Sequence, residues 1–184
     1  AVTSMASLTT GAMTFISEQT ASSSASISFT SGIDSTYPIY KFEFINIHPA
    51  TNAATLRFQA DTGTNTSYNQ TMTTTVVRAN QDEADGGAAM SYRPSADQAQ
   101  GTSFQQISQG VRNDNDTSVS GEVIIFNPSS STFVKHFFGQ SNTAIDAGSQ
   151  VTYYAGYFNT TTALTRVQFK MSSGNIDSGT IKLY

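Results

Sequence analysis

Two histidines, His48 and His136, are the residues of this chain best suited to acid–base or metal chemistry near neutral pH. A mononuclear catalytic metal site normally takes three protein ligands, often including two histidines at a short fixed spacing. Neither His-x-His nor His-Glu-x-x-His occurs in the sequence. His48 precedes Pro49 at the end of an apolar run, and His136 lies inside an aromatic run. We therefore interpret both as residues of separate β-strands.

Acidic residues between positions 112 and 122 are the next candidates, since Asp114, Asp116 and Glu122 offer oxygen ligands to a hard cation. An EF-hand loop beginning at Asp114 would need glycine at position 119 and glutamate at position 125. Val119 and Ile125 stand there instead. The segment is interpreted as a solvated turn, and a calcium ion bound in a β-loop is the open alternative.

Glycoside hydrolases use a pair of carboxylates at a defined separation. The chain has four glutamates, of which Glu43 alternates outward among aromatic residues and could lie in a groove. No second carboxylate has a position that the sequence fixes relative to Glu43. Gly-x-Ser-x-Gly, a phosphate-binding loop and a dinucleotide fingerprint are all missing, and the lack of cysteine excludes thiolate catalysis and disulfides. We predict no enzyme activity, no cofactor, and no catalytic, cofactor-binding or metal-binding residues.

The elements that would position these residues are short runs with a period of two, separated by Gly, Pro, Asn, Asp and Ser. Runs of this kind are residues 12–17, 25–30, 39–47, 55–61, 67–79, 121–128, 132–139, 151–159, 163–174 and 179–184. They predict an all-β fold: an antiparallel, jelly-roll-like β-sandwich of about nine to eleven strands in two sheets, with a β-barrel as the second architecture. Residues 15–184 are expected to form this single domain. Residues 1–14, which carry no charge, are expected to form an extended N-terminal arm.

Alternation also predicts which side chains point inward. Residues 40, 42 and 44 share one face, and a change of phase between Ile45 and Ile47 indicates a β-bulge or a strand buried on both faces. Residues 56, 58 and 60 are expected inward, and residues 57, 59 and 61 outward. Residues 80–111 are irregular, and we expect long loops there with a short helix near residues 95–100.

Aromatic residues are concentrated in the run 151–159. Tyr153 and Tyr157 fall on one face of this predicted strand, and Tyr154 and Phe158 on the other. Aromatic residues on both faces suggest that the second face is covered as well, by another subunit. A platform on which sugars stack is the rival interpretation.

Composition restricts the partners. Charged residues make up 12% of the chain and the net charge is −4, whereas ordinary soluble proteins have about 25% charged residues. The nine lysines and arginines are spread along the chain without a basic patch. Nucleic acid and an acidic membrane surface are therefore poor partners.

Five long segments resemble a family of structural proteins from tailed bacteriophages, many of them marine and cyanobacterial phages. These segments are residues 40–52, 96–105, 126–139, 156–163 and 167–184, and the resemblance extends from about residue 37 to residue 184. It implies a β-sandwich on the virion surface, assembled in the bacterial host cytoplasm, that forms a homotrimer and decorates or cements the major capsid protein. The alternative is a tail-fibre or head-fibre receptor-binding module that recognises a host surface glycan. The family brings no catalytic motif.

Overall fold

The computed structural model describes residues 13–145 and 147–184, and these residues form two antiparallel sheets. The predicted N-terminal arm, residues 1–14, lies outside the described residues except for its last two. The larger sheet contains nine strands: β1 (Ser17–Thr20), β3 (Ile39–Pro49), β5 (Met72–Asp82), β6 (Ala88–Tyr92), β7 (Ala99–Gly101), β9 (Val119–Phe126), β10 (Lys135–Ile145), β11 (Gly148–Phe158) and β13 (Ile176–Leu183). The smaller sheet contains four: β2 (Ile27–Phe29), β4 (Leu56–Thr62), β8 (Gln105–Gln106) and β12 (Leu164–Met171).

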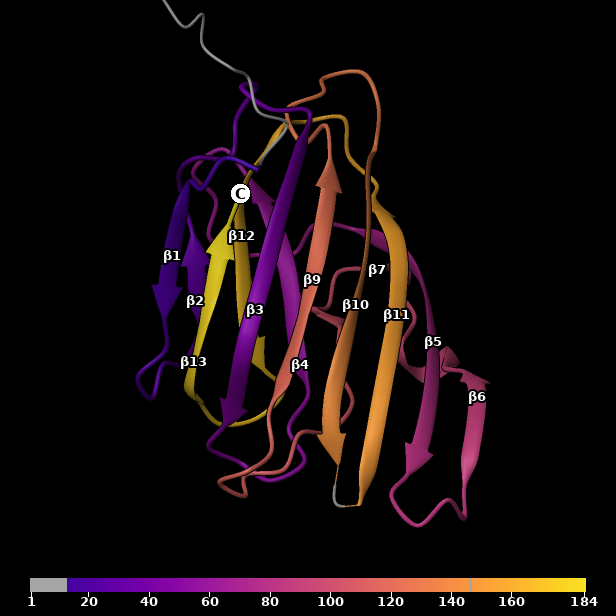
Figure 1. Ribbon diagram of the computed structural model, residues 1–184. Helices are drawn as coiled ribbons and strands as arrows, with labels where there is room; N and C mark the ends of the chain where they lie inside the picture. Colours follow the sequence, from indigo (N-terminus) through magenta and orange to yellow (C-terminus); the bar gives the residue numbers. More distant parts are fainter. Residues whose placement is uncertain (1–12, 146) are drawn as a thin grey trace, which may run out of the picture.

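The predicted all-β sandwich is confirmed, and its strands are wound in nested pairs (Figure 1). Strand β3 pairs with β13, β4 pairs with β12, and β5 pairs with β11. Successive pairs alternate between the large and the small sheet, as in a jelly roll. Strands β9 and β10 then join β3 to β11 within the large sheet, which explains its width. The described residues hold more strands than predicted because short strands such as β7 and β8 leave little pattern in the sequence.

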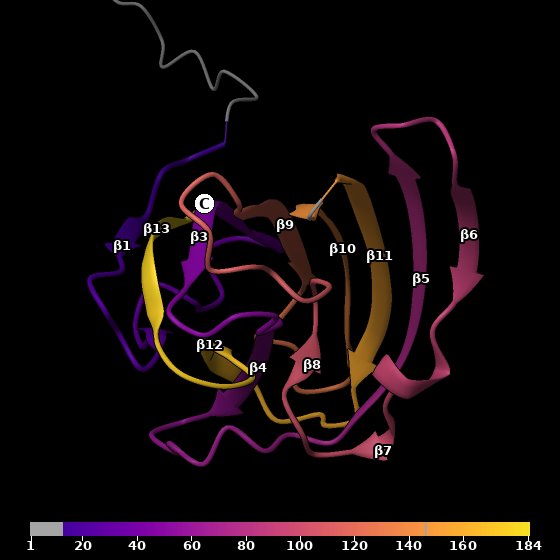
Figure 2. The same cartoon turned by 90° about the horizontal axis from the view of Figure 1, so that it is seen from below.

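An aromatic core lies between the two sheets. Phe58 of β4 is fully buried, and its ring centroid lies 5.1 Å from that of Phe137 and 6.1 Å from those of Phe158 and Phe169. Seen from below, the large sheet curves around the small one, and β5 and β6 extend beyond it (Figure 2). The large sheet therefore has an inner face, which the small sheet covers in part, and an outer face, which is turned toward the viewer in Figure 1.

The β-bulge predicted in the run 39–47 is confirmed. The register of β3 with β9 shifts between Phe44 and Ile47, and Asn46 adopts a positive φ of 52°. Phe44 and Ile47 are consequently both buried, while Ile45 is exposed. Gly179 of β13 lies against the bulge, and a Cβ atom there would be 2.6 Å from the carbonyl oxygen of Asn46. Its φ of +115° is also a conformation for which glycine is suited.

One facing prediction is wrong. Gln59 and Asp61 were expected outward from β4, but both side chains are fully buried. Gln59 Nε2 donates to the carbonyl oxygens of residues 70, 102 and 103, and Asp61 accepts bonds from the Tyr68 backbone N–H and from Gln70. The loops that carry these partners fold back over the small sheet, so β4 is buried on both faces.

Residues 80–111 contain more structure than expected. Strand β6 pairs with the second half of β5, and β7 pairs with the first two residues of β5, so this segment forms the far edge of the large sheet. The short helix expected near residues 95–100 is a single 3₁₀ turn, Pro94–Ala96. Pro94 suits the first position of such a turn because its fixed φ matches and its missing N–H would be unbonded there anyway.

Candidate interaction surface

The two histidines lie at opposite ends of the large sheet. Ile125 of β9 pairs with both Tyr40 and Phe137, so His136, next to Phe137, is level with the start of β3. His48 is the next-to-last residue of β3. The structure therefore brings no shared site together from these two residues. His136 is exposed on the outer face, where its ring lies 6.1 Å from that of Tyr157.

His48 contacts two other segments of the chain from its place on β3. Its Nε2 atom lies 3.1 Å from the carbonyl oxygen of Asp114, and its Nδ1 atom lies 3.5 Å from the Asp177 carboxylate. The histidine thus connects β3 to the loop before β9 and to the start of β13. Beside it is a polar hollow of about 510 Å³, lined by Asn46, His48, Asn115, Asp116, Thr117, Ser118, Asp177 and Ser178.

The three candidate cation ligands of the segment 112–122 are not brought together. Asp114 pairs with Arg112 across 2.6 Å within the loop, and Asp116 is exposed. Glu122 lies on β9 and pairs with Lys41. Within residues 13–145 and 147–184, no group of three or more His, Asp and Glu side chains is placed to hold a metal ion.

Glu43 does have a second carboxylate beside it, which the sequence could not place. Glu43 of β3 is the register partner of Glu122 of β9, and Lys41 Nζ lies 2.7 Å from each carboxylate. Burial alone would lower the pKa of Lys41, but hydrogen bonds and Coulomb attraction from Glu122 and Glu43 outweigh it and raise that pKa above its usual value. The lysine offsets the repulsion of two carboxylates that face each other across neighbouring strands.

A lysine is also buried at the start of β10. Lys135 shares the inner face with Phe137 and is fully buried, and its Nζ atom donates a 3.0 Å hydrogen bond to the carbonyl oxygen of Thr160. No carboxylate of the described residues lies within ion-pair distance of it. Burial lowers the pKa of this ammonium group, because water no longer stabilises its charge.

The outer face of the large sheet carries a band of apolar side chains across its strands. Register places Ile39 beside Phe126, Ile124 beside Phe138, and Tyr153 beside Val77. The rings of Phe126 and Phe138 are 5.5 Å apart. Tyr92 and Met90 of β6 continue the band to the edge, and both are exposed. We call this band the outer-face band; Phe138 is 48% exposed and Tyr153 45% exposed within it.

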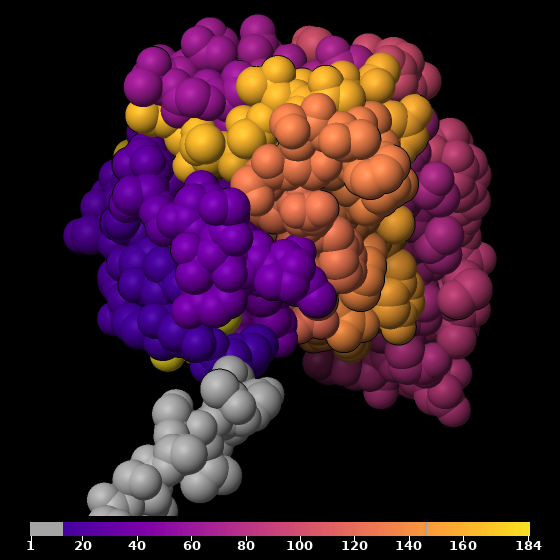
Figure 3. Space-filling model, turned by 90° about the horizontal axis from the view of Figure 1, so that it is seen from above, coloured from indigo at the N-terminus to yellow at the C-terminus, as the bar shows by residue number. Residues whose placement is uncertain are grey.

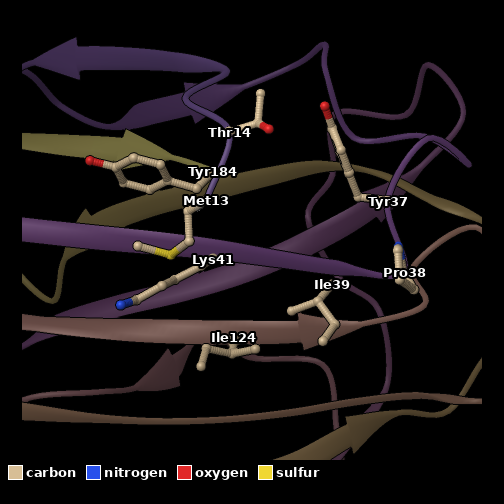
Figure 4. A pocket seen from close by; sticks show the side chains of 8 residues that line it. All are labelled: Met13, Thr14, Tyr37, Pro38, Ile39, Lys41, Ile124 and Tyr184. Carbon is tan, nitrogen blue, oxygen red and sulfur yellow. The ribbon is translucent and has the colours of Figure 1, made fainter. Parts of the chain in front are cut away.

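Two hollows mark the outer-face band. The larger, of about 490 Å³, lies at the β3 end and is lined by Met13, Thr14, Tyr37, Pro38, Ile39, Lys41, Ile124 and Tyr184. Figure 4 shows Met13, Lys41 and Tyr184 grouped on one side of it, and Pro38 and Ile39 on the other. The smaller, of about 260 Å³, lies around Phe138, Tyr153 and Val77. At the upper end of the sheet, the segment before β3 packs against the loop before β10 (Figure 3), where Asn127 N–H donates to the carbonyl oxygen of Pro38.

The aromatic residues of β11 divide between the two faces as predicted. Tyr154 and Phe158 are buried on the inner face, and Tyr153 lies on the outer face. The Tyr154 ring lies over Gly139, and its hydroxyl donates a 2.7 Å hydrogen bond to the carbonyl oxygen of Glu122. A Cβ atom at Gly139 would be 2.1 Å from that oxygen and 2.6 Å from the Tyr154 ring. Burial, aided by the negative charge of Glu122, raises the pKa of Tyr154 well above its usual value.

Among the described residues, no helix has the length and apolar character needed to span a membrane. No protein-family model, no curated protein and no solved structure matches this chain.

Proposed function

We propose that this chain is a structural protein of the virion surface of a tailed bacteriophage, which decorates or cements the capsid as a homotrimer. The observation that carries the proposal is the outer-face band. The small sheet covers one face of the large sheet in part, whereas the opposite face presents Ile39, Phe138, Tyr153, Tyr92 and Met90 to solvent. Large exposed apolar patches on soluble proteins mark interaction sites.

The composition of the band suits a protein interface. Aromatic residues and methionine are enriched at interface cores, and charged residues are depleted there. The outer-face band contains exposed aromatic residues and a methionine. The charged residues next to it, Lys41, Glu43 and Glu122, form ion pairs with one another. A second copy of the chain and the major capsid protein are the proposed partners, as the resemblance to phage structural proteins implies.

Capsid attachment is tested with particles that lack the protein. The N-terminal arm, residues 1–14, is the proposed anchor. Purified full-length protein and a variant without residues 1–14 are added separately to such particles, and occupancy is measured by cryo-electron microscopy. We expect the full-length protein to bind the outer capsid surface and the truncated protein to stay folded but fail to bind. Wild-type occupancy by the truncated protein would show that the N-terminal segment is not the anchor.

A receptor-binding module that recognises a host surface glycan is the second candidate. The polar hollow beside His48 favours it, because Asn46, Asp116 and Asp177 offer the hydrogen-bonding groups that sugar hydroxyls need. A glycan array distinguishes the two functions: binding that is lost in Asp177→Asn supports the receptor-binding module. An empty array together with capsid binding supports decoration.

A further inference from the structure

Buried polar atoms that lack a hydrogen-bond partner all gather in one part of the described structure. The atoms are Arg78 Nε, Ser91 Oγ, Arg93 Nε, Gln109 Nε2, Thr143 Oγ1 and Thr152 Oγ1. More than nine in ten buried polar groups in native proteins are hydrogen-bonded, so such a cluster needs an explanation.

Strand register places these residues side by side on the inner face, where β11, β5 and β6 extend past the small sheet. Thr152 pairs with Arg78, and Arg78 pairs with Ser91. The backbone N–H of Arg93 donates to the carbonyl oxygen of Val76. Arg93 is therefore the cross-strand neighbour of Val76 and lies diagonal to Arg78 on the same face. Arg78, Ser91, Arg93 and Thr152 therefore lie on the same face of the sheet as the buried residues Val76 and Tyr154.

The two remaining members border the same row. Thr152 is also the partner of Ser141 on β10, and Thr143 is two residues further along that strand, on the same face. The Ser141 hydroxyl donates a 2.6 Å bond to the carbonyl oxygen of Ile107, so the segment after β8 lies over this point. Gln109 belongs to that segment.

Both arginines lack a counter-charge within the described part of the chain. Neither Arg78 nor Arg93 takes part in an ion pair or a side-chain hydrogen bond there. The neighbouring carboxylate of Asp97 accepts from the Val76 N–H and from the Tyr92 hydroxyl, and that of Asp82 accepts from the Gly86 N–H.

The other arginines of the protein do have partners. Arg57 donates to Thr55, Arg166 donates to the carbonyl oxygen of Gly63, and Arg112 pairs with Asp114. What sets Arg78 and Arg93 apart among the described arginines is that their side chains have neither a carboxylate nor any other hydrogen-bond acceptor.

The chemistry of the six atoms indicates what would bind them. Guanidinium Nε–H and amide Nε2–H groups only donate hydrogen bonds, and hydroxyl groups can donate. A ligand that satisfies them must therefore present several acceptors, and two guanidinium groups require negative charge. Arginine binds carboxylate, phosphate and sulfate through paired charge-assisted hydrogen bonds.

We propose that the inner face of β11, β5 and β6 is a binding site for a small oxyanion group, a phosphate, sulfate or carboxylate. Arg78 and Arg93 supply the charge, and Thr152 and Ser91 supply hydroxyl donors on either side of Arg78. Thr152 and Thr143 are fully buried and form the floor, while Arg78, Ser91 and Arg93 are partly exposed and leave the site open to solvent. The site is separate from the outer-face band and does not depend on the proposed function.

The test is titration of the full-length protein with sodium phosphate, sodium sulfate and sodium glucuronate at constant ionic strength, followed by NMR of the arginine Nε–H groups. Neutral glucose is the ligand control. We expect the Arg78 and Arg93 resonances to shift with a dissociation constant of about 1 mM or tighter for at least one anion, and not to shift with glucose. A response to glucuronate identifies a carboxylate on a sugar as a source, and a response to phosphate or sulfate alone identifies a free or esterified tetrahedral anion.

Arg78→Gln is the test variant and Arg166→Gln is its control, because both remove one positive charge but Arg166 lies on the small sheet. We expect Arg78→Gln to weaken binding about tenfold or more and Arg166→Gln to change it less than about twofold. If Arg78→Gln does not fold, Arg93→Gln takes its place. Equal weakening in test and control variants, or Nε–H resonances that do not move with any anion, would overturn the proposal and leave ordered water or an adventitious ion only as the partner of these groups.

Discussion

If the outer-face band forms the proposed interface between subunits, replacing Phe138 by serine should weaken their association without unfolding the protein. Phe138 lies in the middle of the outer-face band, where it contacts the ring of Phe126 and borders the hollow around Tyr153. Its side chain is 48% exposed, so the sandwich core does not depend on it. An interface formed by the band would bury the exposed half.

The size of the effect follows from this exposed area. A phenylalanine side chain has roughly 200 Å² to bury, so about 100 Å² of Phe138 remains for a partner to cover. At about 25 cal/mol per Å², burial of that area stabilises each contact by about 2.5 kcal/mol. Loss of this contribution weakens association about 70-fold per contact. A protein that is trimeric at micromolar concentration would then be largely monomeric.

Sedimentation equilibrium over a range of concentrations measures this change, and circular dichroism confirms that the strands remain. Phe133→Ser is the matched control: Phe133 is 69% exposed but lies in the loop before β10 instead of on the sheet. Equal weakening in the two variants would show that the sheet face has no special role. A wild-type protein that is a single species of about 20 kDa at micromolar concentration would refute the interface itself.

Three further predictions concern stability. The folded pKa of Lys135 lies below the unfolded value of 10.5, so the unfolded state binds more protons between the two values. The free energy of unfolding of the wild type, relative to that of Lys135→Met, should therefore rise as the pH increases through this window. A difference between the two proteins that stays constant with pH in urea unfolding would contradict this prediction. Gly139→Ala should cost about 3 kcal/mol or more in chemical denaturation, since its methyl group overlaps a backbone oxygen and an aromatic ring, whereas Gly63→Ala, with nothing within 4 Å, should lose only about 1 kcal/mol from its positive φ; equal losses would refute the steric argument. His136→Gln should leave the melting temperature unchanged, while His48→Ala should lose about 1 kcal/mol with its contact to the loop, and a bound zinc ion lost in either variant would contradict both statements.

The sequence predicted the fold class and most of the core, because alternation of apolar and polar residues reports directly on strand faces. Phe42 and Phe44 are inward for this reason, and the change of phase after Phe44 located the bulge. The pattern was misleading where a polar residue is buried by something other than the opposite sheet. Gln59 and Asp61 look like surface residues, and the loops that return across β4 bury them and give them further hydrogen-bond partners.

The candidate sites depend on contacts between distant segments, which periodicity does not encode. Glu43 and Glu122 face each other because β3 and β9 pair in one particular register. Arg78 and Arg93 become neighbours only when residues 83–87 form a hairpin connection between β5 and β6. The sequence signal that could have drawn attention to them is two arginines at the ends of an acidic, glycine-containing turn, which is typical of a hairpin.

The nested pairing of strands also determines when the protein can fold. Strand β1 pairs only with β13 among the described strands, and β2 pairs only with β12. The two earliest strands therefore have no neighbour until the last two have left the ribosome, a delay on the order of ten seconds at ordinary rates of synthesis. Pairing between strands so far apart in the sequence is slow to form. During synthesis, the nascent chain would expose apolar strands throughout this time, so chaperone supply is expected to limit the yield of the protein more strongly than its final stability does.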